Sequence, residues 1–450
     1  MTPPGPGLRL LAALLALGTG VGCPMDPCRP HEPAALFDDT LFGVGQPLEL
    51  QVPPVTNRCE SSSQGAPEHV TVEVKDPHNR PVAATVALHG NGGAAVVRFT
   101  PELKGRHHLI VSFSPVGSVR QSAIHVVEDR GQQAPVAELS TVVECRSVDR
   151  TTAGTWLCGS SALREPDQEP QPLGDAFAPT VVAGNVVWVT EASRVLRYVD
   201  QGSGPLPPPD TAPFPVVGTP TAAAPHSRLA TEDALLLLDD THLHRYAYTA
   251  EAGLRTTGSV LLPHPRLATF GDMPSLLLRA GDRLLVVRIA EEATLRNFVS
   301  EACPYQVNAE GAPEAVPDEP CHQVPGLPVG YEEDVLWAHA GSAPEQLTLH
   351  RYSAASGRLV LEGVLSMNAP FQAQGPSLRP GFGTPLVFSP RSVDAHYTLP
   401  SWDAETQTLE LTLLPSPNGF KPPRVGARYF HSERWNSIYG VKVYARQSTP

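Results

Sequence analysis

The tetrapeptide Leu243-His244-Arg245-Tyr246 returns unchanged as Leu349-His350-Arg351-Tyr352, 106 residues further along the chain. The match continues downstream of both copies. Gly253-Leu254 and Gly258-Ser-Val-Leu261 parallel Gly357-Arg-Leu359 and Gly363-Val-Leu365, and Val195-Leu-Arg-Tyr198 is a shorter echo 48 residues before the first copy. Each copy follows an apolar strand and a turn. The sequence therefore predicts a repeated β unit of about 50 residues.

Such units recur along the chain from Phe177 onward, at 180–198, 234–246, 275–288, 334–352 and 385–413. Periods of 40–50 residues with several strands each are typical of a β-propeller, whose radially packed sheets bury both apolar faces. We expect an all-β propeller over residues 131–450, with about six sheets. A seventh joins if 142–145 and 155–158 form a hairpin in the ring. We further expect a linker at 132–139 and an inserted loop near 297–330. Additional β-sandwiches are the alternative fold.

The N-terminal part has a different pattern. Between residues 40 and 130, six short segments alternate apolar and polar residues and are separated by Gly, Pro and Asn turns, which predicts an antiparallel β-sandwich. Phe99, Pro101, Gly105, Leu109, Val111 and Phe113 together resemble the filamin-type immunoglobulin repeat. That resemblance implies an immunoglobulin-like domain acting as a spacer or adhesion module.

The first 22 residues read as a secretory signal peptide, with Arg9, an apolar run from Leu10 to Leu17, and small residues. The run is shorter than the roughly 20 residues that span a bilayer. Gly20-Val21-Gly22-Cys23 resembles the lipobox of bacterial lipoproteins, although Gly20 stands where Leu is usual. The resemblance implies a lipid such as palmitate on Cys23, a tether over 23–39, and a place in the bacterial cell envelope, with the outer membrane preferred. An ordinary signal peptide that leaves Cys23 as a free thiol is the alternative.

Seven cysteines are an odd number, and a lipid on Cys23 leaves an even set. Proximity favours the pairs Cys28–Cys59, Cys145–Cys158 and Cys303–Cys321. No Cys-x-x-Cys pair occurs, which disfavours zinc and thioredoxin-like chemistry. Disulfides indicate an oxidising compartment.

Charge and motifs exclude several functions. A net charge of −13 with few lysines disfavours nucleic acid as a partner. Nucleophile elbows, His-Glu-x-x-His and phosphate loops are missing, so we predict no catalytic residue, cofactor or metal. Asp239-Asp240-Thr241-His242 could bind Ca²⁺ or serve acid–base chemistry, but it lies between apolar strands and reads better as a hairpin turn.

Candidate ligand contacts are Arg245, Tyr246, Arg351, Tyr352 and Trp435, although packing between sheets explains a once-per-sheet repeat more simply. The leading hypothesis is a membrane-anchored lipoprotein that binds or scaffolds a protein or glycan of the envelope. A propeller-type glycosidase or lyase is the first alternative, and a purely structural envelope or coat component is the second.

Overall fold

The structure of the chain is a computed structural model. It describes residues 41–54, 67–89, 93–114, 118–129 and most of 133–446. Within that last stretch the gaps are 141–144, 166–167, 176–177, 215–226, 240, 263–274, 291–298, 340–345, 355–356, 369–377, 380, 383–385, 390–395, 404–406, 415–423, 426–427 and 434–439. No helix in these ranges is long and apolar enough to cross a membrane.

The first compact unit comprises residues 45–125 and consists of two antiparallel sheets. One contains β3 (His69–Lys75), β4 (Pro81–Val82), β7 (Gly105–Ser114) and residues 118–125 of β8 (Ser118–Asp129), and the other contains β2 (Leu48–Val52), β5 (Ala84–His89) and β6 (Ala94–Phe99). Alternate side chains of β2 and β7, such as Leu50 and Val111, are buried. Gly105 has φ +110°, and a Cβ there would lie 2.9 Å from Pro77 Cγ, so glycine is required. The immunoglobulin-like and filamin-type assignment stays a prediction.

The second unit comprises residues 38–44 and 126–450 and contains seven small sheets in the described part of the chain. Sheet 1 comprises β10 (Val148–Arg150), β11 (Trp156–Cys158), β12 (Ser161–Leu163) and β13 (Gln171–Pro172). Sheet 2 comprises β14 (Thr180–Ala183), β15 (Val186–Thr190), β16 (Arg194–Val199) and β17 (Asp210–Pro213). Sheet 3 comprises β18 (Ser227–Ala230), β19 (Ala234–Leu238), β20 (His242–Thr249) and β21 (Gly253–Leu261).

The remaining four sheets follow in chain order. Sheet 4 comprises β22 (Leu276–Ala280), β23 (Arg283–Ile289), β24 (Val299–Val307), β25 (Pro313–Ala315) and β26 (His322–Pro325). Sheet 5 comprises β27 (Leu327–Glu332), β28 (Val335–His339), β29 (Gln346–Ser353), β30 (Val360–Asn368) and the short parallel β32 (Gly381–Phe382). Sheet 6 comprises β31 (Leu378–Arg379), β33 (Leu386–Ser389), β34 (His396–Asp403) and β35 (Thr408–Leu413). Its outer strand β35 also pairs in parallel with Glu128 and Asp129, which belong to this second unit, as does β1 (Leu41–Gly43).

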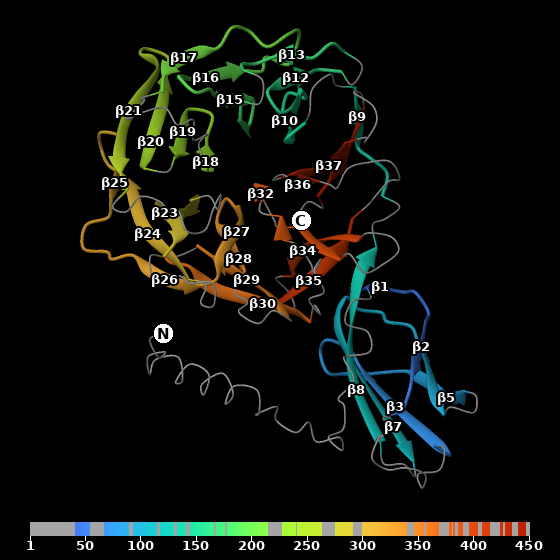
Figure 1. The fold of residues 1–450 in the computed structure, drawn as a ribbon. Coiled ribbons are helices and arrows are strands. Elements are labelled where there is room, and N and C mark those ends of the chain that lie inside the picture. Colours follow the sequence, from blue (N-terminus) through green and yellow to red (C-terminus); the bar gives the residue numbers. More distant parts are fainter. Residues whose placement is uncertain are drawn as a thin grey trace, which may run out of the picture. The chain divides into compact units, whose positions relative to one another are not determined.

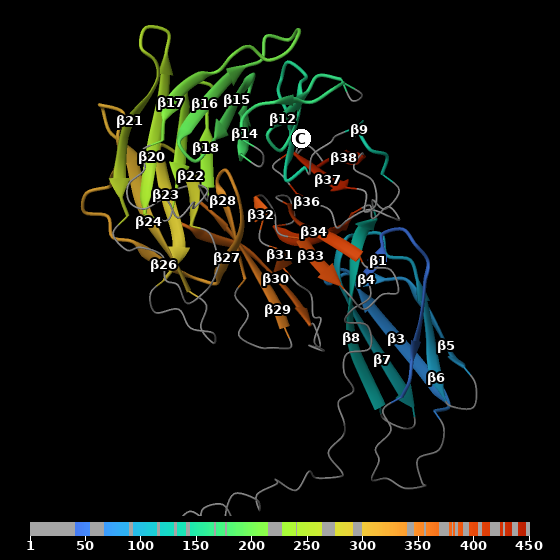
Figure 2. The same cartoon turned by 45° about the horizontal axis from the view of Figure 1, so that its top comes forward.

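The seventh sheet closes the ring. It comprises β36 (Arg424–Val425), β37 (Tyr429–Glu433), β38 (Val441–Ala445) and β9 (Ala137–Leu139), so an early strand completes a late sheet. Figure 1 shows these sheets arranged around a centre, with β18, β27 and β36 on the inner side of their sheets. The tilted view in Figure 2 shows sheets 2 to 4 standing side by side. The inner strands contact each other in succession from β10 through β14, β18 and β22 to β27, while β32 contacts β36 and β37 contacts β10 of sheet 1. This order and closure define a propeller-like all-β architecture.

Packing between neighbouring sheets explains why the strands are apolar on both faces. In β15, Val187 and Val189 pack toward sheet 1, whereas Val186 and Trp188 pack toward sheet 3. Each pair of sequential neighbours shares such a cluster, and Leu139 of β9 belongs to the one between sheets 7 and 1. Because side chains alternate along a strand, a continuous apolar run buries both faces of a sheet.

Three segments differ from expectation. The hairpin of sheet 1 pairs Val148–Arg150, rather than 142–145, with Trp156–Cys158, although it does join the ring. Residues 297–330 are no inserted loop, because they supply β24, β25, β26 and most of β27. Pro313 begins the strand β25, and Pro304 lies between the stretches of β24 that pair with β26 and with β25, so neither proline ends the sheet. The predicted linker at 132–139 contains β9.

Candidate functional site

Four of the predicted site residues lie outside the described ranges: Cys23, Cys28, Cys59 and Trp435. The lipid on Cys23, the Cys28–Cys59 pair and a ligand contact by Trp435 therefore stay predictions. The other predicted residues all lie in the seven-sheet unit, and the structure places each of them.

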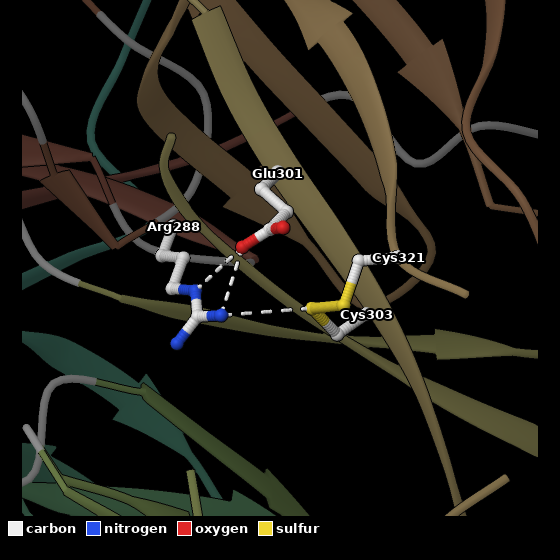
Figure 3. The surroundings of a disulfide bond; sticks show 4 residues. All are labelled: Arg288, Glu301, Cys303 and Cys321. Atoms are coloured by element: carbon white, nitrogen blue, oxygen red, sulfur yellow. Dashed lines mark hydrogen bonds and ion pairs between the residues drawn. A yellow bond between two sulfur atoms is a disulfide. The ribbon is translucent and has the colours of Figure 1, made fainter. Parts of the chain in front are cut away.

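Two disulfides have the pairing expected from proximity, Cys145–Cys158 and Cys303–Cys321. Figure 3 shows the second, where Cys303 on β24 lies beside Glu301 and faces Arg288 of the neighbouring strand β23. Arg288 donates to Glu301 Oε2 at 2.8 Å from Nη2 and 3.0 Å from Nε, and its Nη2 is 3.9 Å from Cys303 Sγ. Glu301, Cys303 and Cys321 lie close enough together to suggest a metal site. Cysteine binds metals as the thiolate, however, and both cysteines are in a disulfide, so the group is a structural cross-link beside an ion pair.

The tyrosine of each repeat fastens its sheet to the preceding one. Tyr246 donates its hydroxyl to Pro213 O at 3.4 Å, and Tyr352 donates to Pro325 O at 2.8 Å. Both acceptors are the last residue of an outer strand of the sheet before, β17 and β26. The same bond joins Tyr198 of the shorter echo to Leu173 O at 2.6 Å. Burial raises the pKa of Tyr352 to about 12 and also raises that of Tyr246, so both hydroxyls remain protonated donors.

The arginine of each repeat reaches the following sheet instead. Arg245 Nη1 donates to Gly311 O of sheet 4 at 2.9 Å. Arg351 lies 5.2 Å from the ring centroid of Trp402 in sheet 6 and is ion-paired with Glu362. Arg197 of the echo lies 3.9 Å from the Tyr248 ring of sheet 3. These contacts place the Arg and Tyr side chains between sheets, and their part in ligand binding stays a prediction.

Both repeats contain the same β-bulge. The pairing of β20 with β21 shifts between Arg245 and Tyr246, and that of β29 with β30 shifts between Arg351 and Tyr352. A glycine faces each arginine, Gly258 in sheet 3 and Gly363 in sheet 5. A Cβ on Gly363 would lie 2.5 Å from Trp402 Cζ3, and one on Gly258 would lie 2.5 Å from Ala312 Cβ. The glycines thus allow the next sheet to approach closely.

The turn between β19 and β20 gathers a carboxylate and two imidazoles. Asp239 Oδ1 accepts hydrogen bonds from the backbone N–H groups of Thr241 at 2.7 Å and His242 at 2.6 Å, so the aspartate does shape the turn. Its other oxygen, Oδ2, lies 2.9 Å from His244 Nε2. One ligand atom from each of Asp239, His242 and His244 lies within 4.8 Å of the others.

His244 is fully buried at this turn. Its ring stacks on His242 with centroids 5.5 Å apart and lies 5.3 Å from the ring of Phe214. Its Nδ1 has no hydrogen-bond partner among the described residues. Sequence reasoning missed this residue as a partner of Asp239 because it belongs to the repeated tetrapeptide. The spacing of His242 and His244 on a strand, two residues apart, was the signal that could have found it.

The outer strand of sheet 5 is the most apolar exposed edge described. Val360 is 52% exposed, and Leu361 and Val364 are each 48% exposed. At the positions that face the same repeat residues in sheet 3, β21 has Arg255, Thr256 and Ser259. β30 is the terminal strand of its sheet in the described part of the chain. Its outer edge therefore offers backbone hydrogen-bonding groups beside aliphatic side chains.

Three of the tryptophans are interior residues. Trp156, Trp188 and Trp337 are at most 5% exposed, and Trp402 is half-buried beneath Arg351. The exposed large hydrophobic residues of the described ranges are all Val or Leu. The tryptophans placed by the structure therefore serve the cores between sheets.

No protein-family model matches the chain, and no curated protein matches it in sequence. Among solved structures, a Bacteroides thetaiotaomicron protein of unknown function is similar at 11% identity, covering 90% of this chain and 96% of that one, with a TM-score of 0.30. A quinoprotein alcohol dehydrogenase-like protein of the same organism is similar at 9% identity, covering 83% and 93%, with a TM-score of 0.30. Hsv2 of Kluyveromyces marxianus is similar at 8% identity, covering 71% and 93%, also at 0.30. These scores are too low to establish a shared fold, so the architecture rests on sheet order and ring closure.

Proposed function

We propose that the protein is an exported, lipid-anchored envelope protein that holds a protein partner on the outer strand of sheet 5. The signal peptide and Cys23 support export and anchoring. Two disulfides in the described residues agree with an oxidising compartment. The observation that carries the binding role is the exposed apolar edge formed by Val360, Leu361 and Val364.

The apolar edge of β30 can be compared with the equivalent strand β21 in the other copy of the repeat. Sheets 3 and 5 share the tetrapeptide, the bulge and its glycine, yet only sheet 5 has aliphatic residues where sheet 3 has Arg255, Thr256 and Ser259. The fold of the repeat therefore does not require an apolar outer strand. A partner strand added to β30 would receive backbone hydrogen bonds, and the aliphatic side chains would be covered. The three apolar residues would lose contact with water, which favours association.

The chemistry of the edge favours a protein over a glycan. Sugar-binding surfaces present flat aromatic faces, and the exposed large hydrophobic residues described here are aliphatic. Desolvated aliphatic and backbone groups are what protein interfaces bury at their centre.

The test is affinity capture from envelope extract with detergent-solubilised full-length protein. A photo-reactive residue at position 361 identifies captured proteins by cross-linking and mass spectrometry. The triple change Val360→Arg, Leu361→Thr and Val364→Ser copies sheet 3 and should abolish capture. The matched control, Thr256→Ser with Ser259→Thr on β21, should leave capture intact. Equal capture by both variants, or no cross-link from position 361, would rule out this surface.

A separate experiment tests the anchor. Cells are grown with a palmitate analogue, and wild type is compared with Cys23→Ser. We expect the variant to lose the label and to leave the membrane fraction. Unchanged label and retention would contradict lipidation at Cys23 without affecting the surface on sheet 5.

A further inference from the structure

We propose that Asp239, His242 and His244 form a binding site for a divalent first-row metal ion, with Zn²⁺ the best match. The site lies at the turn between β19 and β20 of sheet 3. It is independent of the partner surface on sheet 5. Imidazole nitrogens and one carboxylate are ligands that Zn²⁺ binds readily in proteins.

Strand geometry brings the two imidazoles together. His242 and His244 are two residues apart on β20, so their side chains leave the same face, and their rings stack at a 5.5 Å centroid separation. Asp239 Oδ2 is 2.9 Å from His244 Nε2. Around tetrahedral zinc, ligand atoms at about 2.0–2.1 Å from the metal are roughly 3.3 Å apart. The existing arrangement therefore needs only a few tenths of an ångström of opening at that pair.

The carboxylate is held with one oxygen free for a metal. Oδ1 accepts from the backbone N–H groups of Thr241 and His242 and lies 3.1 Å from the Thr241 hydroxyl. Oδ2 faces the imidazole of His244 and makes no other hydrogen bond described. Bonds of this kind around a ligand fix its orientation before the metal arrives.

The charge of the site suits a cation. Asp239 supplies a carboxylate oxygen, and His242 and His244 supply imidazole nitrogens, so the atoms that lie within 4.8 Å of one another are all electron-pair donors. The Asp239 side chain is 16% exposed, and His242 is half-buried, so an ion can reach the site from solvent. Three protein ligands leave one tetrahedral position for water.

The second copy of the repeat shows that this cluster is not a packing requirement. In sheet 5, His350 takes the place of His244, and its Nδ1 lies 3.0 Å from the Tyr352 hydroxyl. Thr348 takes the place of His242, two residues earlier on the strand. The repeat therefore folds with one histidine, and sheet 3 carries a second one beside a carboxylate.

The test uses tag-free full-length protein that has been stripped with a chelator. Titration with ZnCl₂ is followed by calorimetry, and titration with CoCl₂ by the visible bands of tetrahedral Co²⁺. We expect one ion per chain and a rise in melting temperature with Zn²⁺, because an ion that binds only the folded state stabilises it. His242→Gln and Asp239→Asn should each weaken binding by more than tenfold.

The control is His350→Gln, which changes the equivalent histidine of sheet 5 and should leave Zn²⁺ affinity unchanged. Circular dichroism checks that each variant folds, and His242→Gln carries the result if Asp239→Asn does not fold. Absence of saturable binding would overturn the proposal. So would binding that survives His242→Gln unchanged, because the Asp239–His244 contact would then be a purely structural hydrogen bond.

Discussion

Sheets 3 and 5 share a tetrapeptide and differ in what surrounds it. In both, the tyrosine bonds to the preceding sheet, the arginine reaches the following sheet, and a glycine permits close approach at a bulge. Sheet 3 adds Asp239 and His242 at its turn, whereas sheet 5 adds the aliphatic edge at Val360, Leu361 and Val364. The shared tyrosine, arginine and glycine hold neighbouring sheets together in the ring. The two candidate sites lie at the features that the copies do not share.

The largest effect is expected from removing the shared tyrosines. Tyr246→Ala and Tyr352→Ala should each destabilise the protein by about 3–5 kcal/mol, because a large buried ring leaves a cavity. Urea unfolding followed by fluorescence measures the loss. If only one of the two substitutions lowered the free energy of unfolding, the tyrosine would not have the same structural role in both sheets.

Next come the glycines of the bulge. Gly258→Ala and Gly363→Ala should each cost about 1–3 kcal/mol, since the added Cβ would overlap atoms of the next sheet at 2.5 Å. The same urea titration applies. Gly253→Ala is an informative contrast, because its Cβ meets no atom within 4 Å and only its φ of +65° opposes the change. Wild-type stability for Gly363→Ala would mean that sheets 5 and 6 are not in close contact there.

A smaller effect concerns acid stability. His350 lies beside the Tyr352 hydroxyl, and burial lowers the pKa of His350 and that of His339 below 6.5. The unfolded chain then binds more protons than the folded one below pH 6.5, so stability is lost as pH falls. His350→Gln should reduce the drop in urea midpoint between pH 7.5 and 5.5. An identical drop in the variant would exclude His350 as a contributor.

The smallest effect on stability is expected from the triple change on β30. Val360→Arg, Leu361→Thr and Val364→Ser alter exposed side chains, so each should change the free energy of unfolding by no more than about 0.5 kcal/mol. Thermal melting of the variant checks this. A large loss of stability would indicate that these residues serve the ring itself, which would remove the contrast with sheet 3.

Local sequence patterns predicted many of the strands. They did not predict which strands pair when the partners are far apart in the sequence. Alternating apolar residues and the tetrapeptide marked β20 and β29, and short spacing indicated the Cys145–Cys158 and Cys303–Cys321 disulfides. The three residues of β9 carry too little pattern to predict a partner about 300 residues away. Prolines interrupt the apolar pattern of β24 to β26, so the sequence predicted a loop where the structure has strands.

The candidate metal site could be predicted only in part. Asp239 and His242 stood out as a polar pair, but turn chemistry explained them without His244. Only the strand direction shows that His244 turns its Nε2 toward Asp239. The apolar edge of β30 was equally hidden, because exposure of an outer strand depends on which sheet packs against it.

The pairing of β9 with β38 has a consequence for biogenesis. Synthesis from the N-terminus delivers Ala137–Leu139 long before Val441–Ala445. Until the last stretch emerges, the ring stays an open arc, with apolar faces uncovered on sheet 1 and on the newest sheet. The pairing of β38 with β9 is therefore the last step of assembly. A chain that lacks its last dozen residues would lack β38, and its ring would stay open even if the earlier sheets had formed.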